Sequence, residues 1–284
     1  MPRTLAQPPR PSAATATAMR IAFADPTAPV PADARVLRSF ADPRPAAAVA
    51  TPAELASLAD EPVWPEPSDA LIVRVSPDRR PASERWLDRP DHPDAPLPVE
   101  VPIEGGRLRW RPGRAVLEGP LGRPDDVLAG LIDFAFYEGE LRRLESALPP
   151  FEGVAAGDAP FAYDIRQTDR DRWPRFRRTM EQLAVLRLTF ARLEPRLGRP
   201  SRAQPPEARR AFGRLCARAQ VGDRLAAVSD RLEACEDLYE GAVDRITDHR
   251  WWHKGHRLEA IIVGLLAIEG VQLAVELMLR LRGR

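Results

Sequence analysis

The placement of proline constrains the fold of this chain more than any other feature of its sequence. Of its 31 prolines, 23 lie at or before Pro124, and none follows Pro206. Proline has no backbone N–H and interrupts helices and central strands. We therefore expect little helix before Pro124, whereas residues 207–284 can form helix without interruption.

Charge and cysteine content exclude several classes of protein. The 42 basic and 41 acidic residues give a formal net charge of +1, which argues against a protein that coats a polyanion. All the basic residues except Lys254 are arginine. The two cysteines, Cys216 and Cys235, form no CxxC pair, which excludes a zinc ribbon, a thioredoxin motif and a disulfide-rich fold.

Residues 1–68 are expected to form a disordered tail. They are rich in alanine and proline, and few large apolar side chains are available to offset the entropy of ordering. Residues 1–24 contain three arginines and no acid, which leaves a mitochondrial targeting segment open as an alternative. They lack the apolar core of a secretory signal.

Residues 69–168 are expected to form a small α/β head. A β-rich run at 70–75 predicts one strand, and residues 115–118 predict another pairing segment. Between them, 99–103 and 107–111 flank Glu104-Gly105-Gly106, which is typical of a hairpin turn.

A helix is predicted to follow this sheet. It begins at Asp125 and Asp126, whose charges suit the positive end of a helix, and it is expected to stop at Pro149-Pro150. These two acids, with Glu138 and Glu140, form no convincing acid/base pair, and we predict no catalytic residues and no cofactor.

Residues 169–256 are expected to form a coiled-coil-like helical hairpin of helices 171–197 and 207–250. In both helices apolar residues alternate at spacings of three and four, which is the pattern of helices that pack along one narrow stripe. We expect the second stripe to mediate homo-oligomerisation through Leu225, Val228, Leu232, Cys235, Tyr239 and Ile246.

Residues 257–284 are expected to form a C-terminal membrane anchor. The segment 260–279 is predominantly apolar and long enough to cross the ~30 Å of a bilayer core. Four neighbouring residues have the composition of a membrane interface and favour a cytoplasmic (or matrix) location for the bulk of the chain. They are Trp251, Trp252, Lys254 and Arg257.

Polar residues make insertion of this segment marginal. Glu269, Gln272 and Glu276 share one face of the helix, and a central carboxylate costs a few kcal/mol, against about −4 to −7 kcal/mol from the apolar side chains. Two alternatives therefore stay open. The segment could lie on a membrane as an amphipathic helix, or it could be a buried helix of a soluble bundle.

The C-terminal part of the chain resembles a known family. Residues 224–277 contain RLxxxxDRLEACEDLYE followed by HRLEAIIVGLLAIEGVQLAVEL. They resemble the required-for-meiotic-nuclear-division family, also called YagE-like or domain of unknown function 155. Ala260 replaces a usual tryptophan, and the histidine spacing is slightly altered. The matching motif consists of His256, Arg257, Leu258, Glu259, Ile261, Ile262, Ile268 and Glu269.

The resemblance implies a membrane-anchored protein with an α/β head and no established enzymatic activity. It also implies a possible role in supporting translation at a membrane. The expected fold class is thus α+β: a small sheet-containing head, long coiled-coil-like helices and a C-terminal apolar helix.

Two further clusters could carry chemistry. His249, His253 and His256 share a helix face and could bind a transition metal, although interfacial polar residues are the simpler interpretation. The segment 170–178 interleaves arginines with Trp173 and Phe176, a composition that suits RNA or anionic lipid. Its simpler interpretation is an amphipathic helix start with solvated arginines.

The leading functional hypothesis is a non-enzymatic, membrane-anchored scaffold that contacts lipid and further copies of itself. Contact with RNA or the ribosome is left open. The alternative hypothesis is a soluble or peripheral enzyme of unknown reaction, whose last helix is a buried core helix.

Overall fold

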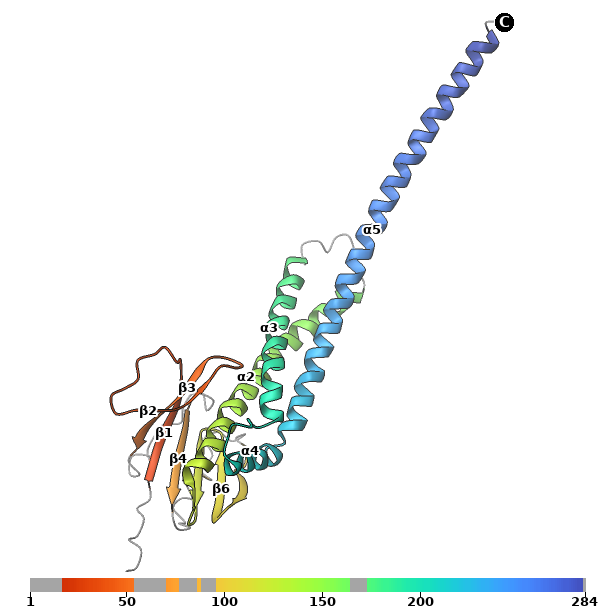
Figure 1. Cartoon of the computed structure of the whole chain (residues 1–284). Helices are drawn as coiled ribbons and strands as arrows, with labels where there is room; N and C mark the ends of the chain where they lie inside the picture. Colours follow the sequence, from red (N-terminus) through yellow and green to blue (C-terminus); the bar gives the residue numbers. More distant parts are fainter. Residues whose placement is uncertain (1–16, 54–69, 77–85, 88–95, 164–172, 283–284) are drawn as a thin grey trace, which may run out of the picture. The chain divides into compact units, whose positions relative to one another are not determined.

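The fold is α+β and centres on a seven-stranded sheet (Figure 1). The structure, a computed structural model, describes residues 17–53, 70–76, 86–87, 96–163 and 173–282. The strand order is β2-β3-β1-β4-β7-β6-β5, in which β4 and β7 run parallel and all other neighbours run antiparallel. The strands are β1 (Thr17–Ala24), β2 (Arg35–Phe40), β3 (Ala46–Ala53), β4 (Ala70–Ser76), β5 (Val99–Ile103), β6 (Gly106–Arg111) and β7 (Arg114–Glu118).

Strands β1, β2 and β3 correct the expectation of a disordered N-terminal tail. They occupy much of residues 17–53 and enlarge the predicted small sheet. Residues 46–49 of β3 are all buried, and three of them are alanines. Alanine-rich strands are easily mistaken for disordered sequence, because alternating small side chains give no clear pattern of apolar and polar residues. They are stabilised here by pairing with strands on both sides.

The hairpin of β5 and β6 confirms the turn predicted at Glu104-Gly105-Gly106. Gly105 has φ +78°, a left-handed conformation that a side chain disfavours. A Cβ on Gly106 would lie 2.0 Å from the carbonyl oxygen of Glu118, so the closeness of β7 also requires glycine there. The predicted strands at 70–75 and 115–118 are present as β4 and β7.

Helix α2 (Pro124–Tyr163) is largely buried in its first half and extends past the end predicted at Pro149-Pro150. It continues beyond Pro149-Pro150, although proline inside a helix removes a backbone hydrogen bond and its ring crowds the preceding turn. Its residues 130–141 are buried, apart from Tyr137, which is half-buried. A helix covered on all sides is a central element. Its Phe134 and Phe136 meet rings of the sheet at Trp110, Phe23 and Phe40.

Three helices follow, and the last is much longer than predicted. They are α3 (Trp173–Gly198), α4 (Pro206–Arg218) and α5 (Val221–Arg282). Between α4 and α5 the backbone turns at Gln220, which has φ +51°. Helix α4 packs closely on α2, since a Cβ on Gly130 would lie 2.2 Å from the carbonyl oxygen of Ala208.

The chain divides into two compact units. One comprises Met1–Pro149 and Ala184–Leu232, and the other comprises Pro150–Leu183 and Glu233–Arg284. In the second unit, Asp158 is buried and accepts a 3.0 Å hydrogen bond from the hydroxyl of Tyr239. Arg175 lies 3.2 Å from the other carboxylate oxygen of Asp158, and Phe176 contacts the ring of Tyr239 edge-on.

The apolar stripe of α5 is buried within the single chain. Leu225, Val228, Leu232, Cys235 and Tyr239 are each at most 8% exposed, while the side chain of Ile246 lies outside the described residues. The periodicity therefore identified a packing face correctly. The five described residues are already covered by their own chain, so they do not offer an open surface to a second copy. Oligomerisation itself stays a prediction.

The expected transmembrane anchor is wrong. Among the described residues, none of the helices combines the length and the apolar character that crossing a bilayer requires. Residues 257–282 are instead the last part of the continuous helix α5. The predicted membrane localisation is corrected with it.

The last part of α5 is not a buried core helix of this chain either. Residues 261–270 are exposed, including large apolar side chains at Ile261, Leu265 and Ile268, each 58–59% exposed. The findings favour the alternative hypothesis over the membrane anchor only in that the described residues include no membrane-crossing helix.

Candidate functional site

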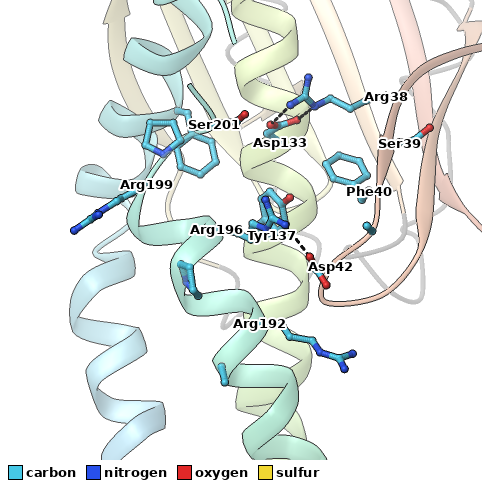
Figure 2. Close-up of a pocket in the computed structure, with 15 residues that line it drawn as sticks. Arg38, Ser39, Phe40, Asp42, Asp133, Tyr137, Arg192, Arg196, Arg199 and Ser201 are labelled. Carbon is cyan, nitrogen blue, oxygen red and sulfur yellow. Dashed lines mark hydrogen bonds and ion pairs between the residues drawn. The ribbon is translucent and has the colours of Figure 1, made fainter. Parts of the chain in front are cut away.

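A cavity of about 530 Å³ lies between β2, α2 and α3 within the first unit (Figure 2). Sites for small molecules in proteins typically have volumes of a few hundred Å³. Buried Phe40, Asp133 and Phe212 contribute to its lining, together with more exposed residues of α3. The polar residues that line it are Arg38, Ser39, Asp42, Asp133, Tyr137, Arg192, Arg196, Arg199 and Ser201.

An ion pair between Arg38 of β2 and Asp133 of α2 lies at one end of the cavity, as Figure 2 shows. The Nη2 atom of Arg38 donates a 2.8 Å hydrogen bond to Oδ2 of Asp133, which also accepts a hydrogen bond from Gln204. Burial raises the pKa of Asp133 to about 6, although Arg38 acts in the opposite direction. This carboxyl group therefore titrates close to neutral pH.

A second ion pair joins Arg196 of α3 to Asp42, which follows β2. The Nη2 atom of Arg196 lies 2.7 Å from Oδ2 of Asp42 (Figure 2). Beside it, burial and then the charge of Asp133 raise the pKa of Tyr137, so its hydroxyl keeps its proton. The cavity thus has a hydroxyl donor between two ion pairs.

Two arginines of the cavity have no carboxylate partner among the described residues. These are Arg192 of α3 and Arg199, which directly follows the end of α3. The lining contains four guanidinium groups and two carboxylates, so its formal charge is +2 when both acids are ionised. An anion is therefore the electrostatically favoured occupant.

Aromatic rings give the cavity an apolar side. Phe40 lies in the lining, and its ring stacks on Phe136 at 3.9 Å between centroids. The ring of Tyr137 meets Phe40 edge-on at 5.6 Å. Because Phe136 is fully buried behind it, Phe40 is held in place. The site can therefore contact an apolar group as well as an anion.

This site was not found from the sequence. Arg38 and Asp133 are 95 positions apart, and Arg38 lies in the segment that we expected to be disordered. The one local signal was the recurrence of arginine at positions 192, 196 and 199. It lies beside an apolar seam, where solvated arginines are common.

The acids considered for catalysis stabilise the fold instead. Glu138 and Glu140 of α2 are buried, and each is ion-paired: Glu140 with Arg44 at 2.9 Å, and Glu138 with Arg224 at 2.9 Å. Asp125 is exposed at the beginning of the helix. The structure does not bring these acids together as a reactive pair.

The thiol of Cys216 is not an activated nucleophile. Burial, followed by the charge of Glu138, raises its pKa to about 12, so the thiol stays neutral. Its sulfur lies 3.9 Å from the carbonyl oxygen of Leu197.

The predicted metal, interface and family-motif residues all lie on α5, but the structure does not describe most of their side chains. Within that part, no group of three or more His, Cys, Asp or Glu side chains could hold a metal ion. Glu269, Ile261, Ile262 and Ile268 are exposed on α5. The side chains that lie outside the described residues are those of His249, Trp251, Trp252, His253, Lys254, His256, Arg257, Leu258 and Glu259.

The basic segment 170–178 is largely charge-balanced where it is described. Arg175 pairs with Asp158, and Arg177 lies 3.0 Å from Glu181. Phe176 is buried, as its simpler interpretation expected, and residues 170–172 and the side chain of Trp173 lie outside the described part. The described residues therefore favour the structural interpretation of this segment.

Comparisons with known proteins leave the family unassigned. No family model matches the chain, and no curated protein matches it. Among solved structures, the chain is similar to the ZntB cytoplasmic domain from Vibrio parahaemolyticus, with 11% identity. The match covers 71% of this chain and 93% of that chain, with a TM-score of 0.30. A similarity this low supports no conclusion about fold or function, and the sequence resemblance stays a prediction.

Proposed function

We propose that this protein binds a small organic anion in the cavity between β2, α2 and α3. The observation that carries the proposal is the excess of guanidinium groups there. Arg192 and Arg199 have no carboxylate partner among the described residues, beside the paired Arg38 and Arg196. Arginine forms strong charge-assisted hydrogen bonds with carboxylate, phosphate and sulfonate groups.

The apolar side of the cavity indicates what the anionic group is attached to. Phe40, Tyr137 and Pro195 provide rings that can cover an aromatic or aliphatic body, while Tyr137, Ser39 and Ser201 provide hydroxyl groups. A ligand with one anionic end and one apolar end fits both parts. We propose a binding role and no reaction.

Binding of three probes tests this proposal by calorimetry. Benzenesulfonate carries both a charge and a ring, sulfate lacks the ring, and benzyl alcohol lacks the charge. We expect benzenesulfonate to bind most tightly. Replacing Arg192 and Arg199 together by alanine should weaken its binding by roughly tenfold or more, since a charge-assisted hydrogen bond contributes about 1.5–3 kcal/mol.

A double variant of exposed arginines outside the cavity, Arg35→Ala/Arg123→Ala, is the matched control for net charge. It should leave benzenesulfonate binding within about twofold, because exposed charges at a distance are screened by salt. The proposal is wrong if benzenesulfonate does not bind, or if both double variants weaken it equally.

The affinity for benzenesulfonate should rise as the pH falls from 8 to 5. The pKa of Asp133 is raised to about 6 by burial, so the carboxyl group becomes neutral over this range. The formal charge of the lining then changes from +2 to +3, and Arg38 is released to face the ligand. Arg196, Asp42 and Tyr137 also line the cavity. The pKa values of Arg196 and Tyr137 are raised, so neither group changes its protonation between pH 5 and 8.

The variant Asp133→Asn should bind benzenesulfonate at pH 8 about as tightly as the unmodified protein does at pH 5. Its affinity should then vary little with pH, because the titrating group is gone. Sulfonate keeps its charge throughout, so any remaining pH dependence would come from another protein group. An unchanged pH profile in Asp133→Asn would contradict this role for Asp133.

A further inference from the structure

Helix α4 and the loop before it carry charge of almost one sign. Residues 199–218 contain six arginines, all exposed, and one acid, Glu207. The chain as a whole has a net charge of only +1. An abundance of arginine codons would raise the number of arginines everywhere, but it would not remove the acids from one segment.

The arginines of α4 are directed outward by the packing of the helix. Its opposite side buries Ala208, Ala211, Phe212 and Leu215. At 100° per residue, Arg210 and Arg214 fall within the remaining half of the helix, and Arg209 and Arg218 lie at its two edges. These four and Arg202 are hereafter called the arginine surface, and all five are exposed.

Only part of this charge is compensated by the protein itself. Arg210 pairs with Glu207, and Arg214 donates to the carbonyl oxygen of Pro102, which is uncharged. No carboxylate partner is found among the described residues for Arg202, Arg209 and Arg218. The surface therefore offers guanidinium groups to an external partner with several negative charges.

We infer that the arginine surface binds the phosphodiester backbone of single-stranded RNA. Arginine matches phosphate oxygens with two parallel donors, and successive arginines at i and i+4 on a helix are about 6 Å apart along its axis. A row of phosphates can contact such a row of guanidinium groups without any reading of bases.

A membrane surface fits the same helix less well. A helix that inserts into a lipid interface needs bulky apolar side chains on its outward face. Between the arginines of α4, the outward positions hold the small residues Gly213 and Ala217, and the apolar side chains are already buried in the protein.

The test is fluorescence anisotropy of the full chain with a labelled oligouridylate of about 20 nucleotides, titrated at several salt concentrations. We expect binding that weakens steeply with salt. The variant Arg202→Ala/Arg209→Ala/Arg218→Ala should bind at least roughly tenfold more weakly at low salt. It should also lose about two units from the slope of log affinity against log salt, since each phosphate contact on a single strand contributes about 0.7.

The matched control is Arg35→Ala/Arg123→Ala/Arg178→Ala, which removes the same charge from exposed positions elsewhere. It should change RNA affinity by less than about threefold. Circular dichroism checks the folding of both variants. Benzenesulfonate binding should be unchanged in the first, because none of its three replaced arginines lines the cavity.

The inference is overturned if the oligouridylate does not bind at low salt, or if the two triple variants lose affinity equally. It is also overturned if the chain binds vesicles of anionic phospholipid but not RNA. Single-stranded DNA of the same length shows whether the 2′-hydroxyl contributes, and equal binding of both supports a backbone contact. None of these results depends on whether the cavity binds an anion.

Discussion

Replacing Phe136 by alanine is expected to lower the free energy of unfolding by about 3–5 kcal/mol. Phe136 is fully buried in α2, and its ring contacts Phe40 at 3.9 Å and Phe23 at 5.4 Å between centroids. The change removes the apolar contacts of a whole ring and leaves a cavity between helix and sheet. Chemical denaturation followed by circular dichroism measures the loss.

A conservative variant and a surface variant make this test specific. Phe136→Leu keeps most of the volume and should cost less than about 1.5–2 kcal/mol. Leu188→Ala removes an apolar side chain that is 60% exposed on α3, and it should change stability by about 0.5 kcal/mol or less. If Phe136→Ala costs no more than Leu188→Ala, α2 does not pack on the sheet as the structure has it.

Replacing Arg224 by alanine is expected to destabilise the fold by about 3 kcal/mol. Its guanidinium group lies 2.7 Å from both carboxylate oxygens of Glu145 and 2.9 Å from Glu138. The side chain of Glu138 is only 2% exposed, so its charge would be left in the interior with Arg142 as its remaining partner at 2.5 Å. An uncompensated buried charge is much more costly than a lost surface contact.

The exposed pair of Arg177 and Glu181 is the matched control for this prediction. Its side chains are 75% and 63% exposed, so Arg177→Ala should cost about 0.5 kcal/mol or less. Adding Glu138→Gln to Arg224→Ala should recover part of the stability, because the buried charge is then removed. Equal losses from Arg224→Ala and Arg177→Ala would contradict the buried network.

Local sequence patterns predicted the parts of the fold that depend on neighbours along the chain. The glycines of Glu104-Gly105-Gly106 indicated the hairpin, because a tight turn needs a left-handed residue. The spacing of Leu225, Val228 and Leu232 indicated the buried face of α5, because helical periodicity is a property of consecutive residues.

The same patterns failed where the outcome depends on distant partners. Residues 46–49 form part of strand β3 because β1 and β2 pair with it on either side. A run of alanines in the sequence does not reveal these partners. Helix α2 continues through Pro149-Pro150, although its composition predicted an end there. The apolar segment 260–279 matched a membrane anchor in length, yet it is the last part of one 62-residue helix that contains Glu269.

The sequence by itself determined that a strand-rich part precedes long helices, the last of which contains no proline, since backbone hydrogen bonding and side-chain periodicity are local. Only the tertiary structure decided which charges meet. Arg38 and Asp133 become partners because β2 and α2 pack against each other across 95 positions of sequence. The burial that accompanies this contact raises the pKa of Asp133, and burial is a property of the whole fold.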